Sequence, residues 1–270
     1  MAEVKLVRDG AVCEIVLDRP EVLNAVDRGT IAALAAAAAE AAADDAARVV
    51  LLRGAGPHFC AGGDIRMFGA LVDLPAEARG RVLHEIVDSL HPLLTRLRLM
   101  PKPVVAAVQG AAAGFGLSLV LAADLALAAE DAVFASGYIQ LGTSPDGGMT
   151  LTLPRTVGPK RAAELMFLGD RFDARRALEL GIVNRIVPAG ALLDAVRALG
   201  ARLAAGPARA YAAGKALLQA AVGETLDRQL RHEAESFAAC AATDDFVEGV
   251  RAFLEKRRPD FSGAGASARV

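Results

Sequence analysis

Two glycine-rich turns are the first candidates for chemistry in this chain. One runs over residues 53–64 (RGAGPHFCAGGD) and the other over residues 109–116 (QGAAAGFG). Each follows an apolar run and precedes a possible helix, so we expect each to join a strand to a helix. Glycine lets a backbone approach a ligand closely, and the N–H groups at a helix start are unpaired and partly positive. Each turn could hold an anion, although an ordinary structural turn is the simpler interpretation of either one alone.

Common nucleotide and hydrolase motifs do not fit these turns. Gly54 and Gly56 lack the third glycine and the later acidic residue of a dinucleotide fingerprint. Neither turn has the Gly-Lys-Ser/Thr of a P-loop, and Ser118 in Gly-Leu-Ser-Leu-Val is not in a nucleophile elbow. The sequence therefore does not support NAD binding, ATP hydrolysis or serine hydrolysis.

Two titratable residues could carry out acid/base chemistry. Asp146, in Leu-Gly-Thr-Ser-Pro-Asp-Gly-Gly, could move a proton if burial raised its pKa toward the working pH. It could instead cap a helix that begins near Gly147. His91 is the second such residue, and its simpler interpretation is a polar side chain in a helix kink beside Pro92.

The apolar pattern predicts a parallel α/β architecture that would position these residues. Strands are predicted at 12–17, 49–53, 104–108, 125–129 and 132–135, with helices at 28–47, 77–99 and 115–123. Pro92 should bend the second of these helices near His91. We also expect Asp64 to cap a helix that starts at Ile65. After Gly142 helices are predicted at 160–168, 174–180, 191–204, 208–220, 224–239 and 244–256.

Composition excludes several classes of protein. The 270 residues can bury a substantial core, and 30 Lys and Arg against 32 Asp and Glu give no basic excess for nucleic acid. Cys13, Cys60 and Cys240 lie too far apart to suggest a disulfide framework or a zinc site. The apolar stretch at 104–123 contains Gln109 and three glycines, so we expect a strand, turn and helix and not a membrane span. No signal peptide is visible at the start, and we expect a cytoplasmic location.

Taken together, several segments resemble the enoyl-CoA hydratase/isomerase (crotonase) superfamily over nearly the whole chain. The segment Pro-Asp-Gly-Gly at 145–148 resembles the Pro-Asp-x-Gly-Gly pattern of the 1,2-epoxyphenylacetyl-CoA isomerase-like branch. The segments that carry the resemblance are LDRPEVLNA (17–25), FCAGGD (59–64), PKP (101–103), QG (109–110), AD (123–124), LG (141–142) and EGVRAFLEK (248–256).

This resemblance implies an α/β crotonase (ClpP/crotonase-like) β-β-α spiral with a C-terminal helical trimerisation region. The core would span 1–205 and the helical oligomerisation subdomain 206–270. The expected substrate is an acyl-CoA thioester, and the expected assembly is a homotrimer or a dimer of trimers. No metal and no cofactor beyond the CoA of the substrate is expected, nor any nucleic-acid or membrane partner.

The resemblance also assigns roles to particular residues. The backbone N–H groups of Gly63 and Phe115 would form an oxyanion hole for the thioester oxygen and stabilise an enolate. The residues implied to bind CoA are Asn24, Ala25, Ala61, Gly63, Asp64, Ile65, Phe253 and Lys256. The last two would reach the CoA of the same or of a neighbouring subunit.

The sequence departs from the type hydratase at its two catalytic glutamates, whose positions are held by Ser118 and Tyr138. We therefore expect double-bond isomerisation with Asp146 as acid and base. Three alternatives stay open: hydration through a water held by Asp146 and Tyr138, a 4-chlorobenzoyl-CoA dehalogenase-like reaction using His91 and Asp146, and acyl-CoA binding without catalysis.

Overall fold

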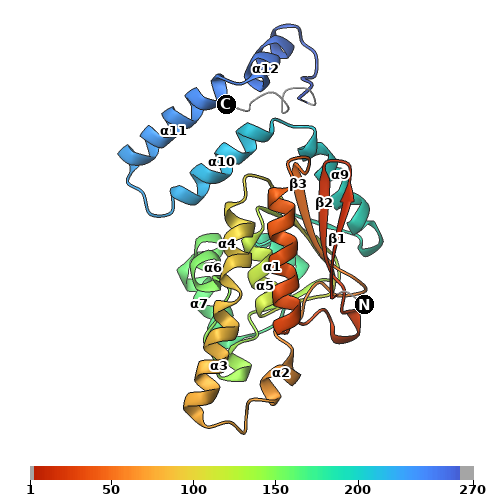
Figure 1. Ribbon diagram of the computed structural model, residues 1–270, viewed down its shortest axis with the longest axis vertical. Coiled ribbons are helices and arrows are strands. Elements are labelled where there is room, and N and C mark those ends of the chain that lie inside the picture. Colours follow the sequence, from red (N-terminus) through yellow and green to blue (C-terminus); the bar gives the residue numbers. More distant parts are fainter. Residues whose placement is uncertain (1–2, 262–270) are drawn as a thin grey trace.

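Two β-sheets organise the part of the chain that the structure, a computed structural model, describes, residues 3–261 (Figure 1). The larger sheet has the strand order β1-β2-β3-β4-β6-β9, and the smaller has the order β5-β7-β8. In the larger sheet every pairing is parallel except that of β1 with β2. The strands are β1 (Val4–Asp9), β2 (Val12–Leu17), β3 (Val49–Gly54), β4 (Val104–Val108), β5 (Ala111–Ala113), β6 (Leu125–Ala129), β7 (Val133–Ala135), β8 (Phe172–Asp173) and β9 (Arg185–Val187).

Helices cover both faces of the larger sheet. Strand residues alternate between the faces, so Val50 and Leu52 join the main core, whereas Val49 and Leu51 pack against α9. The helices are α1 (Arg28–Ala43), α2 (Ile65–Gly69), α3 (Ala76–Asp88), α4 (His91–Leu99), α5 (Phe115–Ala122), α6 (Met149–Val157), α7 (Pro159–Leu168), α8 (Ala174–Glu179), α9 (Leu192–Ala204), α10 (Ala208–Ala220), α11 (Leu226–Ala241) and α12 (Asp244–Leu254). Within residues 3–261, no helix combines the length and apolar character that a membrane span needs.

The chain repeats one path between the two sheets. It passes from β4 into β5 and then α5, and later from β6 into β7. The segment after β3 follows the same path, because Cys60 forms a parallel bridge with Ala112 of β5 before the chain enters α2. This is the β-β-α spiral that the family resemblance implied.

The last three helices form an arm that extends from the sheets at the upper end of Figure 1. Lys215 of α10 fixes the arm to the core, because its buried Nζ donates to the carbonyl oxygens of Leu97 and Lys102 at 2.8 and 3.0 Å. It also pairs with Asp124 Oδ2 at 2.7 Å. Burial lowers the pKa of Lys215, and Asp124 opposes that shift.

Most of the predicted strands and helices are present, but one predicted helix is divided in two. The strands at 12–17, 104–108 and 125–129 have the predicted bounds. The helix predicted over 77–99 is two helices, α3 and α4, with a break at Ser89 and Leu90 just before Pro92. Pro92 lacks an N–H and is tolerated in the first turn of α4, so the chain starts a new helix there. The helix break at residues 205–207 lies at the proposed boundary of the C-terminal subdomain, which stays a prediction.

We expect Lys215→Met to destabilise the fold by about 3 kcal/mol, because it leaves a carboxylate and two carbonyl oxygens without their cation. The measurement is the free energy of unfolding in urea at fixed protein concentration. Arg231→Met removes an exposed ion pair with Asp227 and should cost under about 1 kcal/mol. Equal losses in the two variants would contradict the anchoring role of Lys215.

Candidate active site

Two helix starts meet where successive turns of the spiral run side by side. The Cys60–Ala112 bridge aligns the chain before α2 with β5, the strand before α5. The turn at Gly62 and Gly63 therefore lies beside the turn at Gly114 and Phe115. A Cβ placed on Gly114 would lie 3.8 Å from the Cα of Gly62, and one on Gly62 would lie 3.5 Å from the nitrogen of Phe115. The two turns noted in the sequence thus form one site.

Glycine is required at both turns. Gly62 has a φ of +100° and Gly114 a φ of +52°, which an L side chain rarely adopts. At Gly62 there is also no room, because a Cβ would lie 2.9 Å from the carbonyl oxygen of Ala113. Any larger residue at position 62 would push the two turns apart.

The amides of Gly63 and Phe115 are free to bind a ligand oxygen. Within residues 3–261, neither N–H donates a hydrogen bond to the protein. On either side of Gly63, the Gly62 carbonyl accepts from Val26 and the Asp64 N–H donates to Val26, each at 2.8 Å. Phe115 is the first residue of α5, whose eight residues are all buried, and its N-cap Gly114 has no side chain to satisfy the amide. The helix dipole of α5 adds partial positive charge at this point.

The next turn of the spiral adds the polar side chains. A Cβ on Gly137, after β7, would lie 3.2 Å from the nitrogen of Gly114, so Tyr138 follows directly beside the second helix start. The Tyr138 hydroxyl donates to Asp146 Oδ1 at 2.6 Å. Ser118 of α5 lies 3.4 Å from that hydroxyl and donates to the Asp146 carbonyl at 3.2 Å. The two positions at which the resemblance expected glutamates therefore hold hydroxyls that contact one aspartate.

Burial controls the protonation of this cluster. It raises the pKa of Asp146, while the Tyr138 hydrogen bond and the positive charge of His91 act in the opposite direction. Burial, with the neighbouring Asp146 carboxylate, also raises the pKa of Tyr138 far above its ordinary value. The phenol is therefore a hydrogen-bond donor and not a base near neutral pH, whereas the carboxylate can exchange a proton closer to neutrality.

The alternative interpretation of Asp146 as a helix cap is wrong. The nearest helix, α6, starts at Met149, and its N-cap is Gly148, with no side-chain cap hydrogen bond. Asp146 is half-buried, and within the described residues its Oδ2 accepts no hydrogen bond. One carboxylate oxygen is thus held by Tyr138 and the other is available.

His91 lies near this cluster without a bond to it. It is the first residue of α4, its side chain is 62% exposed, and its Nδ1 lies 3.5 Å from Asp88. A positive charge on His91 lowers the pKa of Asp146, but no hydrogen bond joins the two side chains within residues 3–261. Sequence reasoning missed the contact between Ser118 and Asp146, which no local motif announces because it joins different elements.

The residues implied to bind CoA differ in their exposure to solvent. Some are buried, and others are half-buried or exposed. Asn24 is fully buried, and its amide donates to the carbonyls of Ala55 and His58 at 2.9 and 2.7 Å. The Asn24 side chain therefore ties its loop to the first glycine turn, and a contact of this residue with CoA stays a prediction. Ala25 is buried, whereas Ala61 and Gly63 are half-buried and Ile65 is 60% exposed.

Asp64 caps α2, as predicted, by accepting a hydrogen bond from the backbone N–H of Arg66 at 3.0 Å. The Arg66 side chain, with help from Arg19, lowers the pKa of Asp64 to about 2. The carboxylate is thus ionised and fully paired, and any contact with the nucleotide stays a prediction.

Phe253 and Lys256 do not join the other predicted site residues within one chain. Phe253 lies in α12 and is 83% exposed, and Lys256 follows the end of that helix. Figure 1 places α12 at the opposite end of the long axis from α2. If these two residues contact CoA, they contact the CoA of another subunit.

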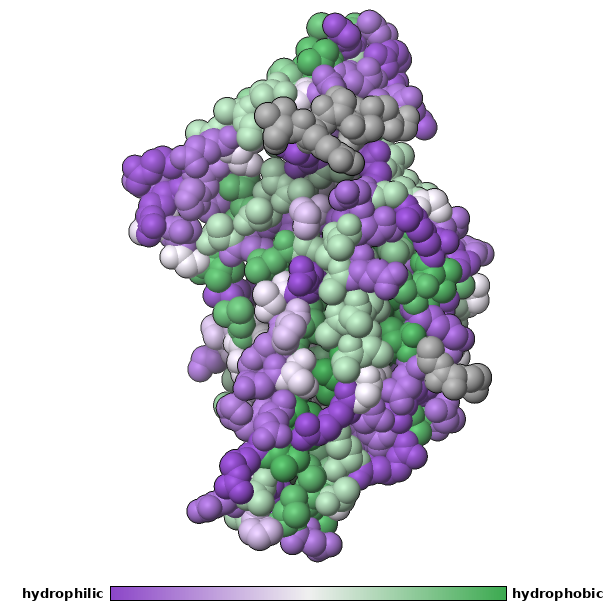
Figure 2. Space-filling model, in the orientation of Figure 1, coloured by the Kyte–Doolittle hydropathy of each residue, from purple (hydrophilic) through white to green (hydrophobic). Residues whose placement is uncertain are grey.

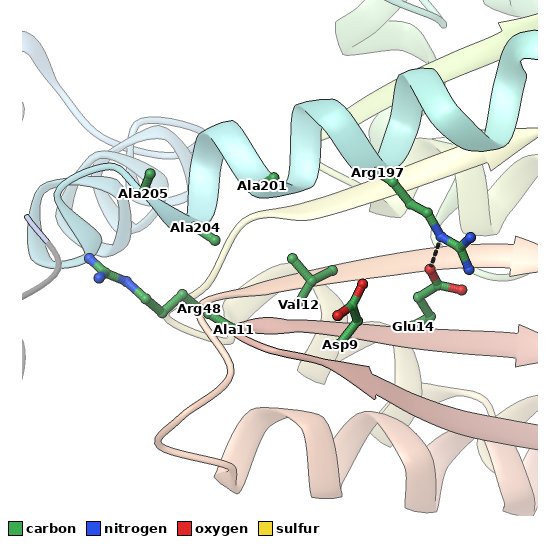
Figure 3. A pocket seen from close by; sticks show the side chains of 9 residues that line it. All are labelled: Asp9, Ala11, Val12, Glu14, Arg48, Arg197, Ala201, Ala204 and Ala205. Carbon is green, nitrogen blue, oxygen red and sulfur yellow. Dashed lines mark hydrogen bonds and ion pairs between the residues drawn. The ribbon is translucent and has the colours of Figure 1, made fainter.

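A separate hollow lies on the α9 face of the larger sheet (Figure 3). It has a volume of about 530 Å³, and its buried Glu14 accepts from Arg197 at 2.7 Å and Arg53 at 2.9 Å. Burial alone would raise the pKa of Glu14, but these two hydrogen bonds outweigh it and lower the pKa. The Glu14 carboxylate is therefore neutralised by two arginines of the protein. These ion pairs join α9 to β2 and β3.

Known proteins resemble this chain in both sequence and overall fold. The chain matches the enoyl-CoA hydratase/isomerase family over residues 8–264. A Rhodobacter capsulatus protein named "Probable enoyl-CoA hydratase" is 41% identical, covering 92% of this chain and 93% of its own. The 1,2-epoxyphenylacetyl-CoA isomerase of Escherichia coli is 37% identical, covering 93% and 95%. The crystal structure of an enoyl-CoA hydratase from Polaromonas sp. JS666 superposes with a TM-score of 0.89 at 36% identity, covering 95% of this chain and 98% of that one.

Proposed function

Because this chain belongs to the enoyl-CoA hydratase/isomerase family, we propose that it isomerises the double bond of an enoyl-CoA thioester. The substrate is an acyl-CoA, and CoA enters only as part of that substrate. The cytoplasmic location stays a prediction.

The proposed chemistry starts at the free amides. The N–H groups of Gly63 and Phe115 bind the thioester oxygen, and they bind it more tightly as negative charge develops there. By analogy with measured oxyanion holes, each donor lowers the barrier by about 3 kcal/mol. An enolate is then accessible from a carbon acid that water alone deprotonates slowly.

Asp146 transfers the proton. Its free Oδ2 removes a proton from carbon 2 of a 3-enoyl group, and the electrons of that C–H bond move into the dienolate. The protonated carboxyl then delivers a proton to carbon 4, which leaves the double bond between carbons 2 and 3. Tyr138 fixes the orientation of the carboxylate through Oδ1, and the pKa raised by burial brings the carboxyl closer to the working pH.

The observation that carries this proposal is the 2.6 Å hydrogen bond between Tyr138 and Asp146. Hydration by two glutamates needs two carboxylates around one water. Here a single carboxylate is held directly by a phenol, so no water lies between those two oxygens. One acid/base group is sufficient for isomerisation.

Hydration is the second candidate, because the relative from Rhodobacter capsulatus carries a hydratase name. In that reaction Asp146 Oδ2 would activate a water on the open side of the carboxylate. A dehalogenase-like reaction is less well supported, because His91 is largely exposed and has no hydrogen bond to Asp146 within the described residues.

We expect the enzyme to convert a 3-enoyl-CoA into the 2-enoyl-CoA without adding the mass of water. The reaction is followed by ultraviolet absorbance of the conjugated thioester and by mass spectrometry in heavy water, where exchange at Asp146 brings deuterium into the product. Asp146→Asn should lower kcat by about 10² to 10⁴, because it removes the proton carrier and keeps its shape. A product heavier by one water would establish hydration, and binding without turnover would identify a non-catalytic acyl-CoA protein.

Replacing Tyr138 by Phe should shift the acidic limb of the kcat/KM profile to higher pH. Asp146 must be ionised to act as the base, so activity falls as the pH drops through its pKa. The Tyr138 hydrogen bond lowers that pKa, so its loss raises the pKa further. Tyr211→Phe, at the only other tyrosine, is the matched control and should leave the limb unchanged. A limb that stays in place in Tyr138→Phe would show that Asp146 does not control it.

We also propose that the protein forms a homotrimer or a dimer of trimers through its C-terminal helices. Large apolar side chains on these helices are exposed, and Figure 2 shows apolar residues over α12 at the upper end. They include Leu226, Leu230, Phe237, Phe246, Phe253 and Leu254, which are 44–83% exposed. Exposed apolar side chains gathered on one part of a protein often mark an interaction surface.

Light scattering should therefore report three or six chains per particle. Phe253→Ser with Leu254→Ser should dissociate the particle, because both side chains lie on the proposed interface. Surface changes at Arg176 and Glu179, an exposed pair on α8, should not. A monomeric wild-type protein at micromolar concentration would contradict the proposal.

A further inference from the structure

The ring of Phe68 lies against the Cα of Gly63, the residue that carries one of the two free amides. A Cβ placed on Gly63 would lie 2.7 Å from Cζ and 2.8 Å from Cε2 of Phe68. These distances are well below van der Waals contact, so the ring fills the space in which a side chain at position 63 would stand. The ring is therefore next to any group whose oxygen binds the Gly63 N–H.

The local helix aims the ring at this position. Side chains in a helix lean toward its N-terminus, so Phe68 covers the turn that begins at Asp64. The Phe68 N–H donates to the Asp64 carbonyl at 3.4 Å, and Asp64 is itself fixed by Arg66 and Arg19. Met67 and Leu71 of the same segment pack against the main core, whereas Phe68 turns toward Gly63.

The other phenylalanine at the site does not have this role. Phe115 is only 3% exposed, and its ring lies under the Asp146 loop, where a Cβ on Gly147 would be 3.1 Å from it. Phe68 is half-buried. Of the two rings, Phe68 is the one that a bound acyl group could touch.

We infer that Phe68 determines acyl specificity by admitting groups that are unbranched at carbons 2 and 3 and excluding groups branched there. This inference rests on the proposed function, because it takes the thioester oxygen to lie on Gly63 and Phe115. With the oxygen about 3 Å from the Gly63 nitrogen, the first acyl carbons lie alongside the ring. The planar dienolate formed from an unbranched chain can stack on an aromatic face, whereas a methyl branch needs space that the ring occupies.

The test compares a linear 3-enoyl-CoA with its 2-methyl analogue in the wild type, in Phe68→Ala and in Phe68→Leu. We expect the ratio of kcat/KM for branched over linear substrate to rise about tenfold or more in Phe68→Ala, with a smaller rise in Phe68→Leu. Phe167→Ala, at a ring 72% exposed on α7, should leave the ratio unchanged. A ratio within twofold of the wild type in Phe68→Ala would overturn the inference.

A binding measurement separates this inference from the proposed reaction. Calorimetry with saturated linear and 2-methyl acyl-CoA thioesters reports the same selectivity without turnover. If the wild type binds both but isomerises no enoyl-CoA, the proposed reaction fails, and the affinity ratio still decides the role of Phe68. If Phe68→Ala leaves that affinity ratio unchanged, the inference fails whatever the reaction is.

Discussion

The parallel pairing of Cys60 with Ala112 is the contact on which the site depends. It aligns two consecutive turns of the spiral, so that the chain reverses at Gly62 and at Gly114 in the same place and two short helices start side by side. Each helix start leaves amides unpaired, and here the amides of Gly63 and Phe115 lie on adjacent turns. Cys60 is fully buried, and its burial raises the pKa of the thiol to about 12, so it is a packing residue and not a nucleophile.

The side chains around the amides form a small polar group in an apolar setting. Ser118 and Tyr138 are each less than one-tenth exposed, and both contact Asp146. A buried hydroxyl needs a partner, and the carboxylate supplies it while its own second oxygen stays open. The same burial that makes Asp146 a weaker acid also makes Tyr138 a fixed donor. The same burial therefore leaves Asp146 able to exchange a proton and Tyr138 able only to donate a hydrogen bond.

Much of this site was predictable because its parts have local signals. Gly62, Gly114 and the helix starts after them are marked by glycine-rich turns that follow apolar strands, and Asp64 has the position of an N-cap. The strands at Val4–Asp9 and Ala111–Ala113 were missed, because one is rich in charged residues and the other is three alanines inside a glycine turn. The contacts of Ser118 with Asp146 and of Phe68 with Gly63 could not be read from the sequence alone. They depend on the tertiary alignment of separate turns and on the direction of a short helix.

The hydrogen-bond donors at this site are backbone amides, whereas the acid/base groups are side chains. Amino-acid substitutions therefore affect these two parts of the site differently. In the proposed reaction, a substitution at Asp146, Tyr138 or Ser118 alters the proton transfer, yet among the standard amino acids only proline deletes an amide hydrogen at position 63 or 115. Random mutagenesis should therefore find new reactions on this scaffold more readily than it abolishes activation of the carbonyl. In the proposed reaction, the backbone amides keep the thioester carbonyl activated whichever side chains stand beside it.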